Sequence, residues 1–173
     1  MSRKIIYSLL IIVVLFFAYV MVGYMAPDFY EGEVTEYFLD RQDDIWKNLV
    51  AVDVIPLRRK HVESITVLGD DIEGIVWRED LTNGKTRFLR VIERHTPYRF
   101  VVERFRSDNG VTGTWEFNLR EVGGKTEVMI HEKSLNKNLW LRAYYTVMGR
   151  DILLRREVKS LRVSLFQRLI TTP

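Results

Sequence analysis

The strongest constraint in this sequence is an uncharged, apolar segment close to its N-terminus. No residue from Ile5 to Met25 carries a charge. As an α-helix rising ~1.5 Å per residue, this segment is ~31 Å long, which matches the ~30 Å hydrocarbon core of a bilayer. A cleaved signal peptide is the alternative, but its apolar core is usually ~7–15 residues and ends in a small-x-small site. Tyr24 precedes Ala26 where such a site needs a small residue, so the sequence favours a membrane anchor over residues 1–26, with residues 5–25 in the lipid bilayer.

The charges that flank this segment predict its orientation. Arg3 and Lys4 precede it, whereas Asp28, Glu31 and Glu33 follow it. Because the positively charged side of a membrane segment stays in the cytoplasm, we expect a single-pass protein with a cytoplasmic N-terminus. The domain that follows would then lie on the outer side, periplasmic or extracellular.

The remaining residues, 27–173, have the length and composition of one folded domain. Hydrophobic residues make up 47% of the chain and charged residues 28%. Two of the 26 basic residues precede the apolar segment, which leaves 24 against 23 acidic residues. This near-neutral balance gives no case for binding nucleic acid. The chain has no cysteine, which excludes disulfides, thiolate catalysis and cysteine metal ligands.

The domain reads as a series of strands followed by a helix. Alternation from Glu33 to Leu39 predicts a first strand, and Asp43 or Asp44 would begin a short helix that ends near Val50. Six further strands joined by tight turns are expected at residues 62–68, 72–81, 87–93, 98–105, 112–121 and 125–133. Short connections of this kind, such as Asn83-Gly84, favour an antiparallel meander over a parallel sheet.

A long amphipathic helix is expected at the C-terminus. Its apolar residues fall on one face and are Leu139, Tyr144, Val147, Met148, Leu154, Val158, Leu161, Leu165 and Leu169. Asn138 is a possible cap, and Gly149 is a place where the helix may kink or split. The expected fold class is therefore α+β, with a seven-stranded antiparallel sheet wrapped round a long C-terminal helix and one N-terminal transmembrane helix.

A set of short motifs along residues 30–170 matches one superfamily in order and spacing. The motifs are Asp44-Ile45-Trp46-Lys47-Asn48-Leu49, Pro56, Val62-Glu63-Ser64-Ile65, Val76-Trp77-Arg78-Glu79, Val91-Ile92-Glu93-Arg94 with Pro97-Tyr98-Arg99-Phe100, and Gly113-Thr114-Trp115-Glu116-Phe117. Together they resemble the START-like helix-grip superfamily, also called SRPBCC, and within it the polyketide cyclase/dehydrase-like proteins. One departure is that Leu57 and Arg58 stand where the family usually has an aromatic residue.

The resemblance implies a cavity between sheet and helix that holds an apolar molecule. Strand alternation indicates which residues face inward, and the candidate ligand-binding set is Trp77, Glu79, Leu89, Val91, Trp115, Phe117, Val128, Ile130, Glu132, Tyr144 and Met148. The alternative for each apolar member is that it simply forms the core.

Glu79 and Glu132 are the sharpest candidates, because an inward carboxylate needs a partner or a raised pKa. As a pair they would act as acid and base on a ligand. The alternative is that both are solvated near strand ends, or paired with Arg78, Arg90 or Arg104.

The sequence contains no readable catalytic centre, no metal-ligand spacing and no motif that calls for a cofactor. Three functions remain open. They are a membrane-anchored binding module for a hydrophobic small molecule or lipid, a protein-interaction module with a filled core, and a cyclase- or dehydratase-like enzyme using Glu79 or Glu132. The fold resemblance favours the binding module, without naming the ligand or the oligomeric state.

Overall fold

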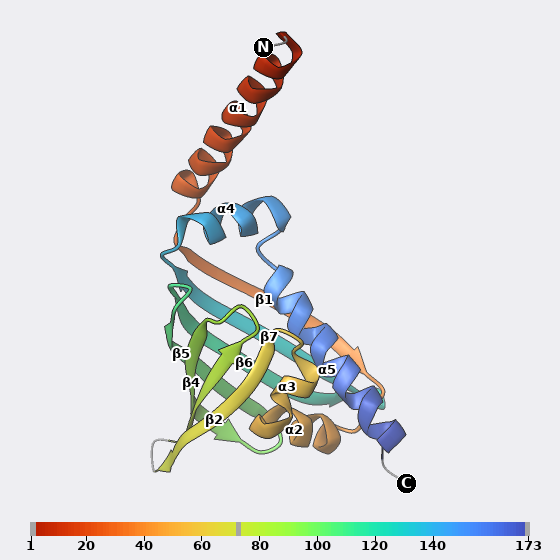
Figure 1. The fold of residues 1–173 in the computed structure, drawn as a ribbon. Helices are drawn as coiled ribbons and strands as arrows, with labels where there is room; N and C mark the ends of the chain where they lie inside the picture. Colours follow the sequence, from red (N-terminus) through yellow and green to blue (C-terminus); the bar gives the residue numbers. More distant parts are fainter. Residues whose placement is uncertain (1–2, 72–73, 172–173) are drawn as a thin grey trace.

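The chain begins with a long apolar helix that extends beyond the sheet and its covering helices. A computed structural model describes residues 3–71 and 74–171. Helix α1 (Arg3–Met25) projects from one end of the sheet (Figure 1) and has a mean hydropathy of 2.9 over its most apolar window. It is long and apolar enough to cross a membrane. Only Ala26, Pro27 and Asp28 separate it from the first strand.

Seven antiparallel strands form one sheet, which confirms the expected α+β fold class. They are β1 (Phe29–Phe38), β2 (Val62–Asp71), β3 (Gly74–Leu81), β4 (Thr86–His95), β5 (Arg99–Ser107), β6 (Val111–Val122) and β7 (Lys125–Asn136). Their order in the sheet is β1-β7-β6-β5-β4-β3-β2. The last six strands are thus a meander, and β1 completes the sheet by pairing with β7.

Several strand boundaries differ from the sequence prediction, including those of β1 and β2. β1 begins at Phe29 rather than Glu33, because its early residues pair with the far end of β7. β2 runs past Gly69 to Asp71, with a shift of register between Val67 and Gly69, so this glycine lies within a strand rather than in a turn. Ile72, where the next strand was expected to begin, lies outside the described residues.

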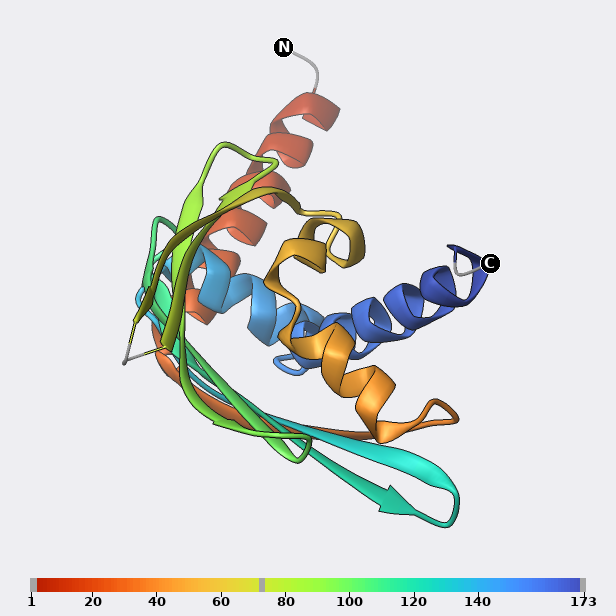
Figure 2. The ribbon, with the colours of Figure 1, turned by 90° about the horizontal axis from the view of Figure 1, so that it is seen from below.

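The helices cover the concave face of the curved sheet (Figure 2). They are α2 (Gln42–Val50), the 3-10 helix η1 (Val52–Val54), α3 (Ile55–Arg58), α4 (Leu139–Met148) and α5 (Ile152–Thr171). Pro56 lies in the first turn of α3, where its missing N–H leaves no hydrogen bond broken. The side chain of Gln42, at the start of α2, donates to the backbone carbonyl of Leu119 at 3.2 Å and so ties α2 to β6.

The C-terminal segment is two helices, not one. Asn138 caps α4 by accepting from the backbone N–H of Trp140 at 3.0 Å and of Leu141 at 3.2 Å. Gly149, with φ at +98°, ends α4, and α5 then turns across the sheet (Figure 1). The buried residues of α5 include Leu154, Val158, Leu161 and Leu165, which is the stripe that the sequence predicted; the side chain of Leu169 lies outside those described.

Gly113 in β6 provides a test of how closely the sheet is packed. Its φ is +147°, and a Cβ there would meet the carbonyl oxygen of Lys133 and lie 2.6 Å from the Cα of Ser134 in β7. Neither backbone atom can move without breaking the hydrogen bonds that pair β6 with β7. We expect Gly113→Ala to lower the free energy of unfolding by about 2 kcal/mol. Gly69→Ala is the matched control, since a Cβ there meets nothing within 4 Å, and it should change the same quantity by less than about 0.5 kcal/mol. Denaturant unfolding of the detergent-solubilised chain measures both; equal effects would contradict the close approach.

Candidate functional site

The interior between sheet and helices contains a group of buried charges. We call Arg58, Arg59, Glu79, Arg87 and Glu157 the arginine–glutamate cluster. Arg59, which follows α3, makes two hydrogen bonds to the carboxylate of Glu157 in α5, from Nε at 2.9 Å and from Nη2 at 2.7 Å. The same guanidinium reaches Glu79 of β3 through Nη1 at 3.3 Å. One side chain therefore joins α3, α5 and the sheet.

Glu79 is surrounded by donors. Besides Arg59, the indole Nε1 of Trp77 donates to it at 3.1 Å, and Nε of Arg87 in β4 makes a short bond to its other oxygen. The side chain is fully buried, at 0% exposure. Burial raises the pKa of Glu79, but Arg87 and Arg59 outweigh burial, so the pKa is lowered overall. Glu79 is thus a charged, fully partnered carboxylate.

Neighbouring arginines lower the pKa of both Glu157 and His61, which keeps Glu157 charged and His61 neutral. Burial raises the pKa of Glu157, but Arg59 and Arg58 overcome it and bring the pKa to about 2. His61 keeps an exposed edge, but the partial desolvation of its ring, together with Arg87 and Arg59, lowers its pKa to about 4. His61 is therefore neutral at pH 7 and can accept the hydrogen bond from Nη2 of Arg87 at 3.3 Å.

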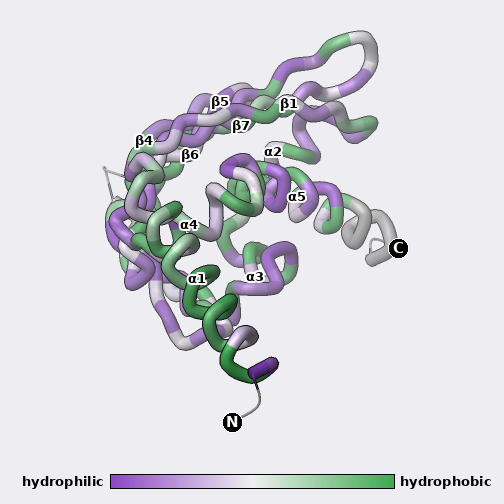
Figure 3. Tube along the Cα trace, turned by 90° about the horizontal axis from the view of Figure 1, so that it is seen from above, coloured by the Kyte–Doolittle hydropathy of each residue, from purple (hydrophilic) through white to green (hydrophobic). Residues whose placement is uncertain are grey.

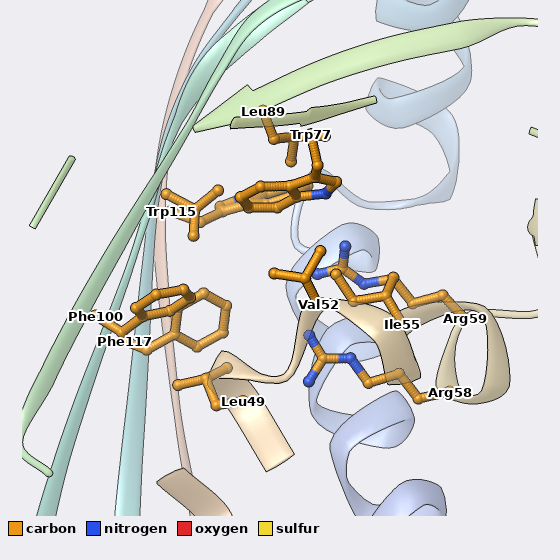
Figure 4. A pocket seen from close by; sticks show the side chains of 11 residues that line it. Leu49, Val52, Ile55, Arg58, Arg59, Trp77, Leu89, Phe100, Trp115 and Phe117 are labelled. Atoms are coloured by element: carbon orange, nitrogen blue, oxygen red, sulfur yellow. The ribbon is translucent and has the colours of Figure 1, made fainter. Parts of the chain in front are cut away.

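The first pocket lies between this cluster and the sheet (Figure 4). Its walls are formed by Leu49, Val52, Ile55, Arg58, Arg59, Trp77, Leu89, Phe100, Val102, Trp115 and Phe117. The cavity volume open to the centre of a water molecule is about 10 Å³, room for roughly one water. Aromatic and aliphatic side chains fill most of this space, and two guanidiniums border it.

The second pocket lies at the end of the sheet nearest α1. It is lined by Asp28, Tyr30, Val111, Glu132, Ser134, Asn136, Arg142, Tyr145, Arg150 and Leu153, and its volume on the same measure is about 20 Å³. Two of these residues belong to α4, two lie at or near the start of α5, and the others belong to β1, β6, β7 and the segment before β1. The pocket therefore lies under the α4–α5 joint.

Glu132 in β7 is the unusual residue of the second pocket. Its side chain is buried, at 1% exposure, and within residues 3–71 and 74–171 neither carboxyl oxygen has a hydrogen-bond partner. Burial raises its pKa. The charge of Arg104, and the indole N–H of Trp115 and the hydroxyl of Ser134, which lie near the carboxyl but outside good hydrogen-bond geometry, do not cancel that effect. A buried carboxyl without a well-placed donor is costly when ionised. Glu132 consequently holds its proton to higher pH than an ordinary glutamate.

Trp115 and Arg104 connect the two pockets. The guanidinium carbon of Arg104 lies 4.3 Å from the centre of the Trp115 ring, and that of Arg59 lies 5.8 Å from it. Arg104 favours the ionised form of Glu132, while burial lowers the pKa of Arg104 itself to about 10. The cation–π contact of Arg104 with Trp115 thus lies between the arginine–glutamate cluster and Glu132.

The structure separates the residues that the sequence grouped as one binding site. Trp77, Leu89, Trp115 and Phe117 line the first pocket, and Glu132 alone lines the second. Val91, Val128 and Ile130 are buried in the core, without lining either pocket. Both carboxylates point inward, as the strand alternation predicted, but Glu79 belongs to the arginine–glutamate cluster and so does not form a pair with Glu132.

Tyr144 and Met148 do not line the pockets. Tyr144 accepts a hydrogen bond from Arg156 at 3.2 Å at the surface, and Met148 is exposed. Tyr145 lines the second pocket instead. The prediction treated α4 and α5 as one helix, so that Tyr144 and Met148 would lie on the same face as the leucines of α5. Because the helix breaks at Gly149, α4 presents a different face to the sheet.

The sequence prediction did not include Arg59, Arg87 or Glu157, although the sequence pattern around two of them indicates that they face inward. Arg87 alternates with the inward residues Leu89 and Val91, and Glu157 lies beside Val158 on the apolar stripe of α5. Arg59 carries no such pattern, because it lies outside the helices and strands. Within the described part of the chain no group of three His, Asp or Glu residues is placed to hold a metal ion.

Comparison with solved structures identifies the fold. No family model and no curated protein matches this sequence. The structure is similar to the ZhuI aromatase/cyclase from Streptomyces sp. R1128, with 14% identity, a TM-score of 0.65 and a match covering 80% of this chain and 93% of that one. A START superfamily protein from Mycobacterium smegmatis matches with 13% identity and a TM-score of 0.63, over 79% and 97% of the two chains. Norcoclaurine synthase from Thalictrum flavum matches with 12% identity and a TM-score of 0.62, over 81% and 96%. The chain therefore has the START-like, or SRPBCC, helix-grip fold that its motifs resembled.

Removing one partner of the arginine–glutamate cluster should be severely destabilising. Glu157→Gln leaves Arg59 buried without its bidentate partner, so we expect the free energy of unfolding at pH 7 to fall by about 3 kcal/mol or more. Arg155→Gln is the control on the same helix, since it breaks only an exposed pair with Asp151, and should cost less than about 1 kcal/mol.

The pH dependence of this effect has a definite sign. Because the folded-state pKa of Glu157 is depressed to about 2 from 4.5, its stabilisation is complete above pH 4.5 and is lost as pH falls toward 2. The difference between wild type and Glu157→Gln should shrink across that window in denaturant titrations. A difference that stays constant would show that the carboxylate charge is not what holds α5.

Glu132 should behave in the opposite way. Its raised pKa means that it favours folding at low pH and loses that contribution as pH rises through the folded-state value. Glu132→Gln should therefore be more stable than wild type at pH 7, by about 1 kcal/mol, and equal to it near pH 4. The measurement is thermal unfolding at both pH values. A variant less stable than wild type at pH 7 would mean that the ionised carboxylate is partnered in the folded protein.

Proposed function

We propose that this chain is a membrane-anchored binding module for a hydrophobic small molecule or lipid, which it holds between the sheet and helices α4 and α5. The observation that carries the proposal is the buried, unpartnered carboxyl of Glu132 in the second pocket. Such a group costs folding free energy, and a ligand that brings a hydroxyl or amine donor would offset that cost. Stability is commonly lower at functional sites for this reason.

The surroundings of Glu132 suit an amphiphile. Tyr30 and Tyr145 supply ring surface with a polar tip, and Val111 and Leu153 supply apolar wall. Arg142 and Arg150 also line the pocket and can interact with oxygen atoms of a polar head group. The three neighbours of similar fold include an aromatase/cyclase and a synthase in complex with a transition-state analogue, so a fold of this kind can hold an organic molecule.

The anchor is part of the proposal. Residues 5–25 of α1 would span the bilayer, with the N-terminus cytoplasmic and residues 27–173 on the outer side, following the flanking charges. The second pocket lies at the α1 end of the domain, so it would lie next to the lipid. A ligand of low water solubility would then pass between bilayer and pocket without crossing open solvent.

Binding requires the pocket to expand. A free volume of about 20 Å³ holds roughly one water molecule, whereas ligand sites commonly enclose about 300 Å³ or more. The arginine–glutamate cluster holds α5 at Glu157, about one helical turn after Leu153, which lines the pocket. The movable parts are thus α4 and the first turn of α5.

The small free volume also favours a second candidate, an interaction module with a filled core. In that case no small molecule enters and the tethered domain binds another protein. A cyclase- or dehydratase-like reaction is supported less, because Glu79 is fixed as a charged ion-pair partner and Glu132 would have to act without it.

A ligand-binding test uses the full chain in nanodiscs and two fluorescent amphiphiles of equal chain length, a monoacylglycerol with free hydroxyls and the corresponding methyl ester. We expect saturable binding of the monoacylglycerol, weakened about tenfold by Glu132→Leu, which corresponds to one hydrogen bond of ~1.4 kcal/mol. Binding of the methyl ester should be unchanged by that substitution.

Glu127→Gln is the matched control on the same strand. Glu127 is also buried, but Tyr37 at 2.8 Å and Arg120 at 2.6 Å satisfy its carboxylate on the other face of β7. This variant should bind both amphiphiles as wild type does. Absence of saturable binding to any variant, together with a native mass equal to the bare polypeptide, would eliminate the binding module in favour of the filled core.

A further inference from the structure

Helix α4 packs against the apolar helix α1 rather than only against the domain. The backbone of α4 approaches α1 at Gly23, where a Cβ would lie 2.5 Å from the carbonyl oxygen of Leu139 and 3.1 Å from the Cβ of Ala143. Ala143 is fully buried by this contact and its surroundings. Small residues that let two helix backbones touch are typical of helix pairs in membranes.

An aromatic group extends the contact toward the middle of α1. Trp140 stacks on Tyr19 with ring centroids 6.1 Å apart and lies 5.9 Å from the ring of Phe16. The hydroxyl of Tyr19 also donates to the backbone carbonyl of Trp140 at 3.0 Å. The three side chains therefore fix the position of α4 along the axis of α1.

This position corresponds to a depth in the membrane. Tyr19 and Phe16 precede the end of α1 at Met25 by ~9 Å and ~14 Å along the helix axis, at ~1.5 Å per residue. If residues 5–25 span a hydrocarbon core of ~30 Å, Trp140 lies inside the leaflet nearest the domain. A helix that touches α1 at this level cannot be surrounded by water.

The exposed face of α4 has the composition that such a position requires. Trp140, Tyr144, Val147 and Met148 recur at the spacing of one helical face, and three of them, Trp140, Val147 and Met148, are exposed large hydrophobic residues. The single charged residue of α4 is Arg142, which lines the second pocket. In Figure 3 the green of α1 continues into parts of α4.

We propose that α4 is embedded in the bilayer leaflet next to the domain, docked on the transmembrane helix α1, and that its apolar face of Trp140, Tyr144, Val147 and Met148 contacts lipid. The occupant of this face is the bilayer itself, because the face is continuous with the lipid-exposed surface of α1. This inference rests on the membrane-anchor part of the proposed function and does not depend on ligand binding. It means that the domain is held at the membrane in one orientation, with α4 forming the wall between lipid and the second pocket.

The absence of cysteine from the sequence allows a direct test with single-cysteine variants of the full chain. Val147→Cys on α4, Leu57→Cys on α3 and Ile12→Cys on α1 all replace exposed side chains, at 64%, 71% and 64% exposure. Each is labelled with an environment-sensitive fluorophore in phosphatidylcholine nanodiscs, which leave both membrane faces open to quenchers. Aqueous iodide and a nitroxide carried on the lipid chains are then compared.

We expect iodide to quench the label at position 147 several-fold less than the label at position 57, and the lipid nitroxide to show the reverse order. The label at position 12 should behave as a lipid-embedded reference. If position 12 is protected from iodide but position 147 is quenched like position 57, the insertion of α4 is refuted while the anchor stands. If position 12 is itself open to iodide, the anchor and this inference both fail.

A second variant tests the docking of α4 on α1. Gly23→Leu forces the two backbones apart, whereas Val14→Leu enlarges an exposed residue of the same helix. Introduced into the Val147→Cys chain, Gly23→Leu should increase iodide quenching several-fold, and Val14→Leu should leave it unchanged. Equal quenching in both would show that α1 does not position α4.

Discussion

The bidentate pair between Arg59 and Glu157 is the interaction on which the interior depends. It joins the segment after α3 to α5, and through Glu79 it continues to β3 and β4. The charges in the group are buried or, for Glu157, nearly buried at 12% exposure, so each is tolerable only while its partners keep their positions. The depressed pKa of Glu157, about 2, reflects how strongly the folded state favours its ionised form. The register of α5 across the sheet is therefore fixed by charge as well as by its leucine stripe.

This arrangement divides the interior into two unlike halves. The half beneath α2 and α3 is closed by aromatic packing, in which Trp46, Phe100 and Phe117 contact in sequence, and its carboxylates are fully partnered. The half beneath α4 contains Glu132, whose oxygens have no partner within the described chain. Nε of Arg58 in the first half also lacks a partner among the described residues, but the buried carboxyl that lacks one lies in the second half. Because buried polar groups are nearly always satisfied in folded proteins, Glu132 is the least stabilised acidic group of the interior.

Much of the fold was predictable from the sequence because local signals agree with it. Turn residues such as Asn83-Gly84 and strict alternation define the meander, Asn138 caps α4 as expected, and Gly149 divides the C-terminal helices. The inward position of Glu79 and Glu132 also followed from alternation. What the sequence could not provide was that Glu79 is paired and Glu132 is not. Arg59, one partner of Glu79, lies 20 positions before it, in a segment without periodicity. The departure at Leu57 and Arg58 left the lining of the pocket open, and the structure places Arg58 at the border of the first pocket.

The contact between α1 and α4 was equally hidden from the sequence, because an apolar segment of this length looks the same whether it is a loose tether or a packing partner. The structure shows that α1 is a packing partner of α4. The segment that follows α1 also bonds to other parts of the domain. Arg150, at the joint between α4 and α5, donates to the backbone carbonyls of Pro27 and Phe29, which lie between α1 and β1 and at the start of β1. The backbone N–H of Asn136, the last residue of β7, donates to the carbonyl of Asp28 at 2.7 Å. Three of these residues, Asp28, Asn136 and Arg150, also line the second pocket. Any displacement of α1 relative to the sheet would therefore alter the wall of that pocket directly. The arginine–glutamate cluster would remain in place, because among the described residues it makes no hydrogen bond or ion pair with α1 or α4.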